Sequence, residues 1–324
     1  MSSSGEFDWI EKYFAPLAGS NSFKLLDDAA LFPVDGADNL IVTQDAIAQD
    51  VHFLGDDPPE RVAKKALRVN VSDIIAKGGT PQAYSLALGV PKNWSEAEIA
   101  SFAQGLAEDQ ETYGLYLIGG DTFRSPGGLM VSVTMLGRPA AQNYVSRLNA
   151  KVGDQVLVSG EIGNAAIALH HIKKGMIETQ AERQQWVDDY QLPVPPLGLE
   201  QTIGRYANAS MDVSDGLVGD AEKICRASGV SITMDIDQVP MSARVQAEIQ
   251  QNALLMETAL NGGDDYQCLF TVPSIHLDQV FEEAGKLGIG LTRIGEVTNG
   301  GDAKLALANR GQPVSIGASS FAHF

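Results

Sequence analysis

The 324-residue chain contains few cysteines, no long apolar run and no recognisable secretory signal. Its two cysteines, Cys225 and Cys268, lie far apart in apolar settings, which predicts buried free thiols rather than a disulfide or a nucleophile. No apolar run approaches the roughly 20 residues of a membrane span. The N-terminus also lacks a basic region followed by an apolar core. We therefore expect a cytoplasmic protein with no membrane partner.

Positive charge is also scarce. The 23 lysines and arginines are outnumbered by 41 aspartates and glutamates, which gives a formal net charge of −18. Binding to nucleic acid or to an anionic membrane depends on a positive surface, so neither is expected as the main partner. ATP is not excluded, because it needs only local positive charge from bound magnesium and a few basic side chains.

The common nucleotide-binding motifs are absent as well. The chain has no Gly-x4-Gly-Lys-Ser/Thr loop and no protein-kinase signature. Residues 159–163 (Ser-Gly-Glu-Ile-Gly) follow a predicted strand, but they lack the third glycine of a dinucleotide-binding loop. We interpret this segment as a tight strand–helix turn.

The chain has instead six short segments in which aspartate stands beside glycine, serine, alanine or threonine. One such segment alone is weak evidence, because glycine and aspartate are ordinary turn residues. Six together, several of them expected at strand ends as in residues 115–121, predict carboxylates that converge in the folded chain. Such oxygen-rich sites suit hard cations such as magnesium, which bridge substrate phosphates. The aspartates are Asp27, Asp28, Asp45, Asp73, Asp121, Asp212, Asp215, Asp264 and Asp265.

The length of the chain predicts two domains, residues 1–140 and 150–324, joined by a polar segment. Apolar periodicity and turn residues predict the elements. An alternation of strands and helices favours an α/β second domain. In the first half, strands are expected at 40–43, 84–88, 116–118 and 129–136, and helices at 59–77 and 95–113. In the second half, strands are expected at 155–159, 211–213, 230–236 and 267–272, and helices at 163–174, 217–228 and 276–287, with a proline-rich loop at 192–197.

A few other side chains are candidate ligand contacts. Arg124 and Arg147 lie beside motif loops and are predicted phosphate partners. The basic patch within residues 64–68 is expected to be a solvated face of its helix. His52 stands near two acidic motifs, where a substrate contact and a structural role fit about equally well. The tail at 321–324 fits either a pocket cap or a seal on the core.

Taken in order, these motifs resemble those of the thiamine-monophosphate kinase family, within the superfamily that includes aminoimidazole ribonucleotide synthetase. The resemblance covers nearly the whole chain, and the order and spacing of the motifs make it specific. The matching segments are Asp-Asp-Ala-Ala at 27–30, Asp45 with Val-His-Phe at 51–53, Lys-Ala-Leu-Arg-Val-Asn-Val-Ser-Asp at 65–73, Ile-Gly-Gly-Asp-Thr at 118–122, Met-Asp-Val-Ser-Asp-Gly-Leu at 211–217 and Gly-Gly-Asp-Asp-Tyr at 262–266.

The resemblance implies that the γ-phosphate of ATP passes directly to thiamine monophosphate and gives thiamine diphosphate. It implies an α+β N-terminal domain that forms half of a dimeric β-barrel, with an α/β C-terminal domain behind it. The implied partners are ATP, thiamine monophosphate and a second copy of the chain, with several Mg²⁺ ions as cofactor. No catalytic acid or base is expected, because a phosphate oxygen is already an anionic nucleophile.

The resemblance also assigns site residues by motif. The implied magnesium ligands are Asp28, Thr43, Gln44, Asp45, Asp73, Asp121, Asp212 and Asp215. The implied ATP contacts are Gly120, Asp121, Arg147 and Ser214. The implied contacts to thiamine monophosphate are His52, Asp264 and Phe321.

Four positions depart from the family pattern. Leu26 replaces a frequent glycine, and Gln44 replaces a hydroxyl residue, although its backbone carbonyl is still an available ligand. Asp264 replaces the usual glutamate, and Phe321 replaces a tryptophan or tyrosine. Two alternatives stay open, namely another ATP-using enzyme of the superfamily and a catalytically silent nucleotide-binding homologue. The reactive cysteines that some of those enzymes carry near their termini are absent here.

Overall fold

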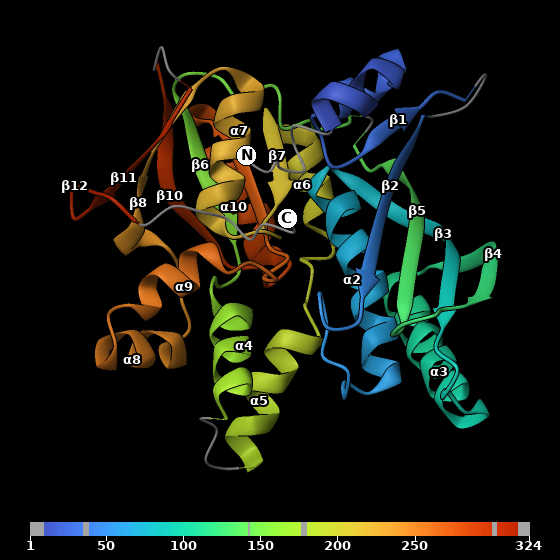
Figure 1. Ribbon diagram of the computed structural model, residues 1–324. Coiled ribbons are helices and arrows are strands. Elements are labelled where there is room, and N and C mark those ends of the chain that lie inside the picture. The colour runs from blue at the N-terminus through green and yellow to red at the C-terminus, as the bar shows by residue number, and fades with distance from the viewer. Residues whose placement is uncertain (1–9, 35–38, 142, 176–179, 300–302, 317–324) are drawn as a thin grey trace.

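The computed structural model describes residues 10–34, 39–141, 143–175, 180–299 and 303–316 (Figure 1). These residues form two sheets, one of five strands from the first half of the chain and one of seven strands from the second half. The predicted fold class, an α+β unit followed by an α/β unit, is confirmed. The division into residues 1–140 and 150–324 stays a prediction, and the last strand of the first sheet ends at Pro139 while the second sheet begins at Asp154.

The first sheet has the strand order β1-β2-β5-β3-β4. Strands β3 and β4 are parallel, and the other neighbouring pairs are antiparallel. The short helical turns η1 (Ile10–Phe14), η2 (Ala15–Leu17) and η3 (Ser20–Leu25) precede it. The strands are β1 (Ala30–Phe32), β2 (Leu40–Ala48), β3 (Gly79–Val90), β4 (Tyr116–Arg124) and β5 (Met130–Pro139).

Local sequence signals explain the two helices of this unit, α2 (Pro59–Ala76) and α3 (Glu96–Tyr113). Helix α2 begins at a proline, whose fixed φ suits a first helical turn. Helix α3 begins with a capping box, in which Ser95 and Glu98 each accept a hydrogen bond from the other's backbone N–H. It ends at Gly114, which has a φ of 67°. Both helices are confirmed to within one residue of their predicted ends.

The second sheet has the order β12-β11-β8-β10-β6-β9-β7, with β11 and β8 parallel and the other neighbouring pairs antiparallel. Its strands are β6 (Asp154–Ser159), β7 (Ala209–Asp212), β8 (Ser231–Asp235), β9 (Cys268–Pro273), β10 (Leu291–Thr298), β11 (Leu305–Asn309) and β12 (Gln312–Val314). The helices are α4 (Asn164–Lys174), α5 (Gln180–Gln191), α6 (Leu199–Tyr206), α7 (Leu217–Ser228), α8 (Ala243–Gln251), α9 (Leu255–Asn261) and α10 (Leu277–Lys286), with short turns η4 (Ile236–Gln238) and η5 (Ser274–His276).

Several predicted element limits were wrong. Strand β2 runs to Ala48 and β4 runs to Arg124, so Asp45 and Asp121 lie inside strands rather than at their ends. Pairing with neighbouring strands keeps both segments extended, since Asp45 pairs with Val133 and Asp121 pairs with Ala87. Strands β1, β10, β11 and β12 and helices α5, α6, α8 and α9 were not predicted.

Helix α2 lies between the two units (Figure 1). It packs on β2, β3 and β5 of the first sheet and contacts β7 and β9 of the second. Such a helix has little solvent-facing surface, and its buried residues include the polar side chains of Lys65, Asn70, Ser72 and Asp73. Within the described residues, no helix combines the length and apolar character needed to cross a membrane.

Two separate glycine-to-alanine variants, one a test and one a control, probe the close packing of α3 on α2. A Cβ at Gly105 of α3 would lie 2.1 Å from the backbone oxygen of Glu60, whereas a Cβ at Gly285 of α10 would meet no atom within 4 Å. Helix propensity favours alanine at both positions. We expect Gly105→Ala to lower the free energy of unfolding by about 1–3 kcal/mol through overpacking. Gly285→Ala should leave it unchanged or raise it by up to about 1 kcal/mol.

Chemical denaturation monitored by circular dichroism measures both variants. Equal effects of the two substitutions would contradict the close α2–α3 contact.

Candidate active site

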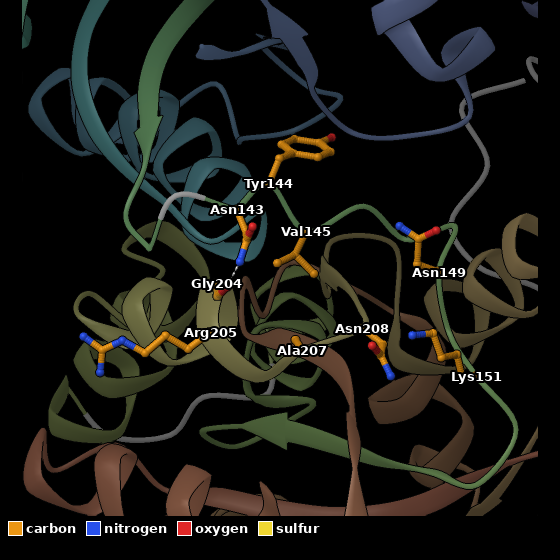
Figure 2. Close-up of a pocket in the computed structure, with 9 residues that line it drawn as sticks. All are labelled: Asn143, Tyr144, Val145, Asn149, Lys151, Gly204, Arg205, Ala207 and Asn208. Atoms are coloured by element: carbon orange, nitrogen blue, oxygen red, sulfur yellow. Dashed lines mark hydrogen bonds between the residues drawn. The ribbon is translucent and has the colours of Figure 1, made fainter. Parts of the chain in front are cut away.

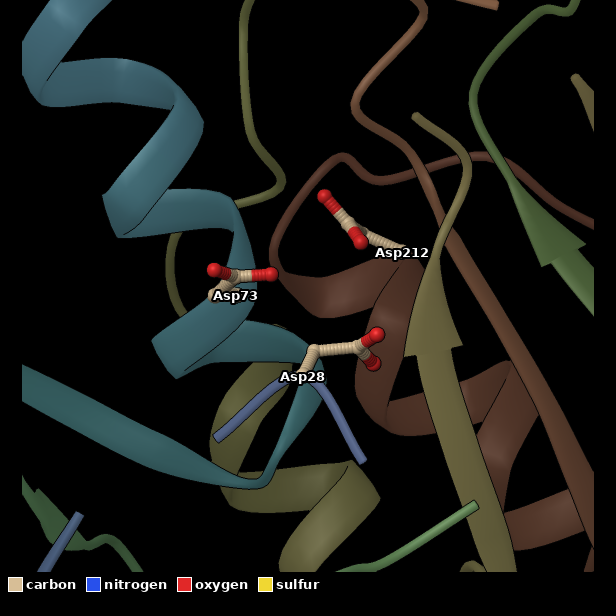
Figure 3. A group of neighbouring side chains, drawn as sticks. All are labelled: Asp28, Asp73 and Asp212. Atoms are coloured by element: carbon tan, nitrogen blue, oxygen red, sulfur yellow. The ribbon is translucent and has the colours of Figure 1, made fainter. Parts of the chain in front are cut away.

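Three carboxylates from distant parts of the chain meet between the two sheets (Figure 3). Asp28 precedes β1, Asp73 lies on α2 and Asp212 ends β7. One oxygen atom from each residue lies within 4.8 Å of the others. We call Asp28, Asp73 and Asp212 the carboxylate cluster. Its spacing and its all-oxygen donor set suit a hard divalent cation.

Hydroxyl groups orient two of these carboxylates. Thr43 Oγ1 donates to Asp73 Oδ2 at 2.6 Å, and Ser72 Oγ donates to Asp212 Oδ2 at 2.8 Å. Because side chains alternate along β2, Asp45 lies on the same face as Thr43. Its charge raises the pKa of both Asp73 and Asp212, which places it near the cluster.

Gln44 points to the other face of β2. Its Nε2 donates to Ser132 Oγ of β5 at 3.1 Å, and its side chain is exposed. The Gln44 side chain is therefore directed away from the carboxylate cluster. Its backbone carbonyl is the group that stays available as a ligand.

The three carboxylates differ in their electrostatic surroundings. Burial alone would raise the pKa of Asp28, but Arg147 and Lys77 beside it hold that pKa well below the usual range. Burial raises the pKa of Asp73 well above its ordinary value, and the charges of Asp45, Asp212 and Asp28 add to the effect. Burial and Asp28 do the same to the pKa of Asp212. The cluster therefore has too little positive charge around it when all three carboxylates are ionised.

Asp28 Oδ2 is buried and lies 2.7 Å from Lys77 Nζ, which also donates to Asp27 Oδ1 and to the Ser210 carbonyl. This shared ammonium offsets only part of the negative charge of the cluster. Burying carboxylates without enough compensating charge is costly. The residues present thus fit a divalent metal ion.

Charged groups flank the cluster on one side. Arg147 donates from Nε to the Leu26 carbonyl at 2.5 Å and from its NH1 nitrogen to Asp28 Oδ1 at 3.0 Å. The backbone carbonyl at position 26 is thus used whichever side chain stands there. Arg147 reaches the predicted site, whereas Arg124 donates to the Pro91 carbonyl at the far edge of the first sheet.

The turn after β7 carries Ser214 and Asp215. Their backbone N–H groups both donate to Asp220 Oδ2, at 3.0 and 3.1 Å. Lys223 Nζ lies 2.5 Å from Asp215 Oδ2 and 2.8 Å from Asp220 Oδ1. Sequence reasoning missed Asp220 and Lys223, although their i, i+3 spacing on a predicted helix marks them as neighbours.

A second group of polar residues gathers at the other end of α2. Lys65 Nζ donates to the His52 carbonyl at 2.9 Å and to Asp264 Oδ2 at 3.1 Å, and it lies 4.0 Å from the centre of the Tyr190 ring. The Tyr266 hydroxyl donates to Asp264 Oδ1 at 3.1 Å. The structure therefore brings His52 and Asp264 together, as expected of two contacts to one substrate.

The predicted solvated patch within residues 64–68 was wrong, because the side chains of Lys64 and Arg68 are only 19% and 13% exposed and that of Lys65 is buried. Lys65 is 2% exposed, because the second unit covers this face of α2. Lys64 pairs with Glu108, and Arg68 pairs with Asp109. Sequence alone did not reveal which face of α2 would meet another unit.

Two predicted site residues, Gly120 and Asp121, lie far from the carboxylate cluster of their own chain. Gly120 and Asp121 are exposed on β4, the outer edge of the first sheet (Figure 1). Asp121 pairs with Ala87, Ala87 with Ser132, and Ser132 with Ala46 beside Asp45. Three strand spacings separate Asp121 from β2, which is about 14 Å. Phe321 lies outside the described residues.

A hollow of about 300 Å³ lies at the junction of the two units (Figure 2). It is lined by Asn143, Tyr144, Val145, Asn149, Lys151, Gly204, Arg205, Ala207 and Asn208. Two of its polar side chains bond to the protein itself, since Asn143 donates to the Gly204 carbonyl and Asn208 donates to Asp154. Tyr144 separates this hollow from the cluster, because its hydroxyl donates to Asp27 Oδ2 at 2.7 Å. The hollow is thus distinct from the carboxylate cluster.

Comparison with known proteins places this geometry in a family. Residues 26–138 match the family model described as AIR synthase related protein, N-terminal domain, and residues 151–308 match the model of its C-terminal domain. A thiamine-monophosphate kinase of Caulobacter vibrioides is 35% identical over 91% of this chain and 84% of its own length. One of Haemophilus influenzae is 32% identical over 99% of this chain and 98% of its own.

Solved structures agree with these relatives. A structure described as AaThiL complexed with AMPPCP and TMP covers 100% of this chain and 98% of its own, with a TM-score of 0.86 and 30% identity. The thiamine-monophosphate kinase of Stenotrophomonas maltophilia covers 89% of this chain and 90% of its own, with a TM-score of 0.77 and 32% identity.

The substitution Asp73→Asn tests the electrostatics of the cluster. In the folded wild type the pKa of Asp73 is raised, so folding retains a proton that the unfolded chain releases above its ordinary pKa of about 4. The stability that this proton contributes is fully present below the pKa of Asp73 in the unfolded chain. It is lost as the pH rises through the pKa of Asp73 in the folded protein. In excess chelator, we expect wild-type stability to fall more steeply than that of Asp73→Asn between about pH 5 and about pH 9.

Differential scanning fluorimetry across this pH range measures the difference. At the alkaline end the variant should be more stable than wild type, because it no longer carries the buried charge. Addition of magnesium should stabilise wild type more than the variant. Parallel pH profiles for the two proteins would contradict the assigned repulsion.

Proposed function

The chain belongs to the thiamine-monophosphate kinase family of AIR synthase related proteins, and we propose that it transfers the γ-phosphate of ATP to thiamine monophosphate, giving thiamine diphosphate and ADP. The observation that carries this proposal is the carboxylate cluster of Asp28, Asp73 and Asp212, which lies where both units of the fold meet. Transfer between two phosphates needs positioning and charge neutralisation more than covalent chemistry.

The proposed cofactor is Mg²⁺. When bound, it would supply the positive charge needed to offset the two phosphate groups. Asp28, Asp73 and Asp212 are the proposed central ligands, and their spacing and all-oxygen donor set support this role. The other proposed ligands are Thr43, Asp45, Asp121, Asp215 and the backbone carbonyl of Gln44.

Two of the proposed ATP contacts, Arg147 and Ser214, lie on the side of the second unit, and the other two, Gly120 and Asp121, lie on β4. Arg147 carries a guanidinium group beside the cluster, and such groups pair well with phosphate oxygens. Ser214 adds a hydroxyl on the turn that precedes α7. Gly120 and Asp121 complete the proposed set. We further propose a cytoplasmic location, with which the buried free thiols of Cys225 and Cys268 are consistent.

The acceptor is proposed to bind at the opposite end of α2. His52 and Asp264 are held there by Lys65, and Phe321 is the third proposed contact. Both oxygens of Asp264 accept hydrogen bonds from the protein, one from Lys65 and one from Tyr266. These bonds keep a carboxylate that is one methylene shorter than the usual glutamate in a defined orientation. The acceptor phosphate is already anionic, so these residues need only orient it.

We also propose that the working unit is a homodimer in which β4 of one copy completes the site of the other. Two observations support this. Asp121 and Gly120 lie about 14 Å, or three strand spacings, from β2 of their own chain. The free edge of β4 also exposes apolar side chains, with Tyr116 at 59%, Ile118 at 54% and Leu117 at 46%. A bare apolar edge strand is a surface that a second chain readily covers.

Direct detection of product tests the reaction. We expect purified protein with ATP, thiamine monophosphate and magnesium to form thiamine diphosphate, measured by mass spectrometry, and to form none in excess chelator. Asp45→Asn and Asp121→Asn should each lower kcat at least about a hundredfold, as removal of a charged group from a phosphoryl-transfer site does. Asp278→Asn, on an exposed position of α10, is the matched control and should retain wild-type activity. Full activity of Asp121→Asn would contradict its role.

Subunit mixing tests the shared site. Asp73→Asn and Asp121→Asn subunits are each expected to be inactive alone. If Asp121 serves the partner's site, a mixed dimer contains one intact site and one doubly defective site. Since half of randomly formed dimers are mixed, the recovered activity should be about one quarter of wild type. No recovery after unfolding and co-refolding, with dimers confirmed by ultracentrifugation, would place Asp121 in its own chain's site or outside the reaction.

A further inference from the structure

The side chain of Lys77 is fully buried at the C-terminal end of α2, with an exposed fraction of 0%. Three oxygen atoms surround its ammonium group. Nζ donates to Asp27 Oδ1 at 2.7 Å and to the Ser210 carbonyl at 2.8 Å, and Asp28 Oδ2 lies 2.7 Å away. An ammonium has three protons and no other way to satisfy them in a buried site. Lys77 is therefore held in one place by its surroundings.

The partners of Lys77 belong to the segments that supply the carboxylate cluster. Asp28 is itself a member of the cluster, and Ser210 lies on β7 two residues before Asp212. Lys77 follows Asp73 by one helical turn on α2, and its backbone N–H donates to the Asp73 carbonyl at 3.0 Å. Lys77 thus connects all three sources of the cluster, through its side chain to Asp28 and Ser210 and through its backbone to the segment of Asp73.

Further contacts hold Asp27 and the backbone around Lys77 in place. Asp27 is fully buried at its side chain, and its second oxygen accepts from the Tyr144 hydroxyl at 2.7 Å. The Lys77 carbonyl accepts from the Val145 N–H at 3.0 Å. The Cβ of any residue replacing Gly78 would come within 3.0 Å of Gly204 on α6, so the two units touch directly beside Lys77. The backbone around Lys77 therefore has little room to move if the lysine is replaced.

We propose that Lys77 is a positioning residue for the metal site: it sets the separation of Asp28, Asp73 and Asp212 without being a ligand itself. The inference rests on the proposed function, because it takes the carboxylate cluster to be the place where the divalent cation binds. Its consequence is that cation affinity depends on a residue whose charge has the same sign as the cation.

Whether loss of Lys77 weakens or strengthens cation binding distinguishes a positioning role from a purely electrostatic one. If Lys77 acted only through its charge, removing it would leave the cluster more negative and strengthen cation binding. If Lys77 positions the carboxylates, removing it weakens binding, because the oxygens no longer converge at the spacing that the cation needs. A purely structural role would lower the melting temperature without a specific change in cation affinity.

The charge-balanced variant Lys77→Met/Asp27→Asn tests the proposal. It removes one positive and one negative charge from the same buried pair, so no ion is left without its partner and the net charge near the cluster is unchanged. The probe is Mn²⁺, which prefers the same oxygen ligands as magnesium and is followed by electron paramagnetic resonance. We expect binding weaker than that of the wild-type full-length protein by about tenfold or more, measured without nucleotide.

A matched pair at the other end of α2 serves as the control. Lys65→Met/Asp264→Asn also removes a buried ion pair of α2, with an Nζ–Oδ2 distance of 3.1 Å. It should leave Mn²⁺ affinity within about twofold of wild type, because it lies two helical turns, about 12 Å, from Asp73. Its expected defect is a raised KM for thiamine monophosphate.

The variant Lys77→Arg covers the case in which the double variant fails to fold. Arginine keeps the positive charge, but its planar head group cannot place donors where the compact ammonium does. Weaker Mn²⁺ binding by Lys77→Arg supports the proposal. The proposal is overturned if a folded Lys77 variant, either the double variant or Lys77→Arg, binds Mn²⁺ within about twofold of wild type. Tighter binding would overturn it as well. Absence of Mn²⁺ binding by the wild type would instead overturn the metal site of the proposed function.

Discussion

Mutual repulsion among buried carboxylates is the constraint on which the rest of this structure depends. Asp28, Asp73 and Asp212 approach one another closely enough for their oxygens to lie within 4.8 Å. Holding ionised groups in such a place costs several kcal/mol for each uncompensated charge. The protein offsets part of this cost with Arg147 and Lys77 on Asp28, and with hydroxyl donors on Asp73 and Asp212. The remaining charge imbalance is what the proposed divalent cation would relieve.

Helix α2 is the element that makes this arrangement rigid. It is packed on the first sheet on one side and against β7 and β9 of the second sheet on the other. Lys65, Ser72 and Lys77 each bond across to the second unit. The twelve residue steps from Lys65 to Lys77 correspond to a rise of about 18 Å along the helix axis. The proposed acceptor end and the proposed metal end are therefore held at a set distance by one helix.

The outer edge of the first sheet is exposed, whereas α2 is buried between the two units. Strand β4 is exposed along its length, and it carries both apolar side chains and the Gly-Gly-Asp segment. Asp121, a proposed metal ligand, is far from the cluster of its own chain, because strands β3 and β5 stand between β4 and β2. In the proposed homodimer, a second copy would cover the apolar edge and receive Asp121 at its own cluster. The proposal thus makes the oligomeric state part of the active site.

The sequence by itself determined the chemistry of this protein, because the order of its aspartate and glycine motifs carries both the family and the preference for oxygen-ligated cations. It also determined α2 and α3, whose start and stop signals are local. Tertiary structure decided the rest. Lys65 and Lys77 resemble ordinary surface lysines until a second unit covers their helix, and no local signal specifies that contact. Asp45 and Asp121 look like residues at strand ends, yet pairing with distant strands extends β2 and β4 beyond them. Burial and strand pairing arise between residues far apart in the chain, so only the folded structure reveals which charges are enclosed together.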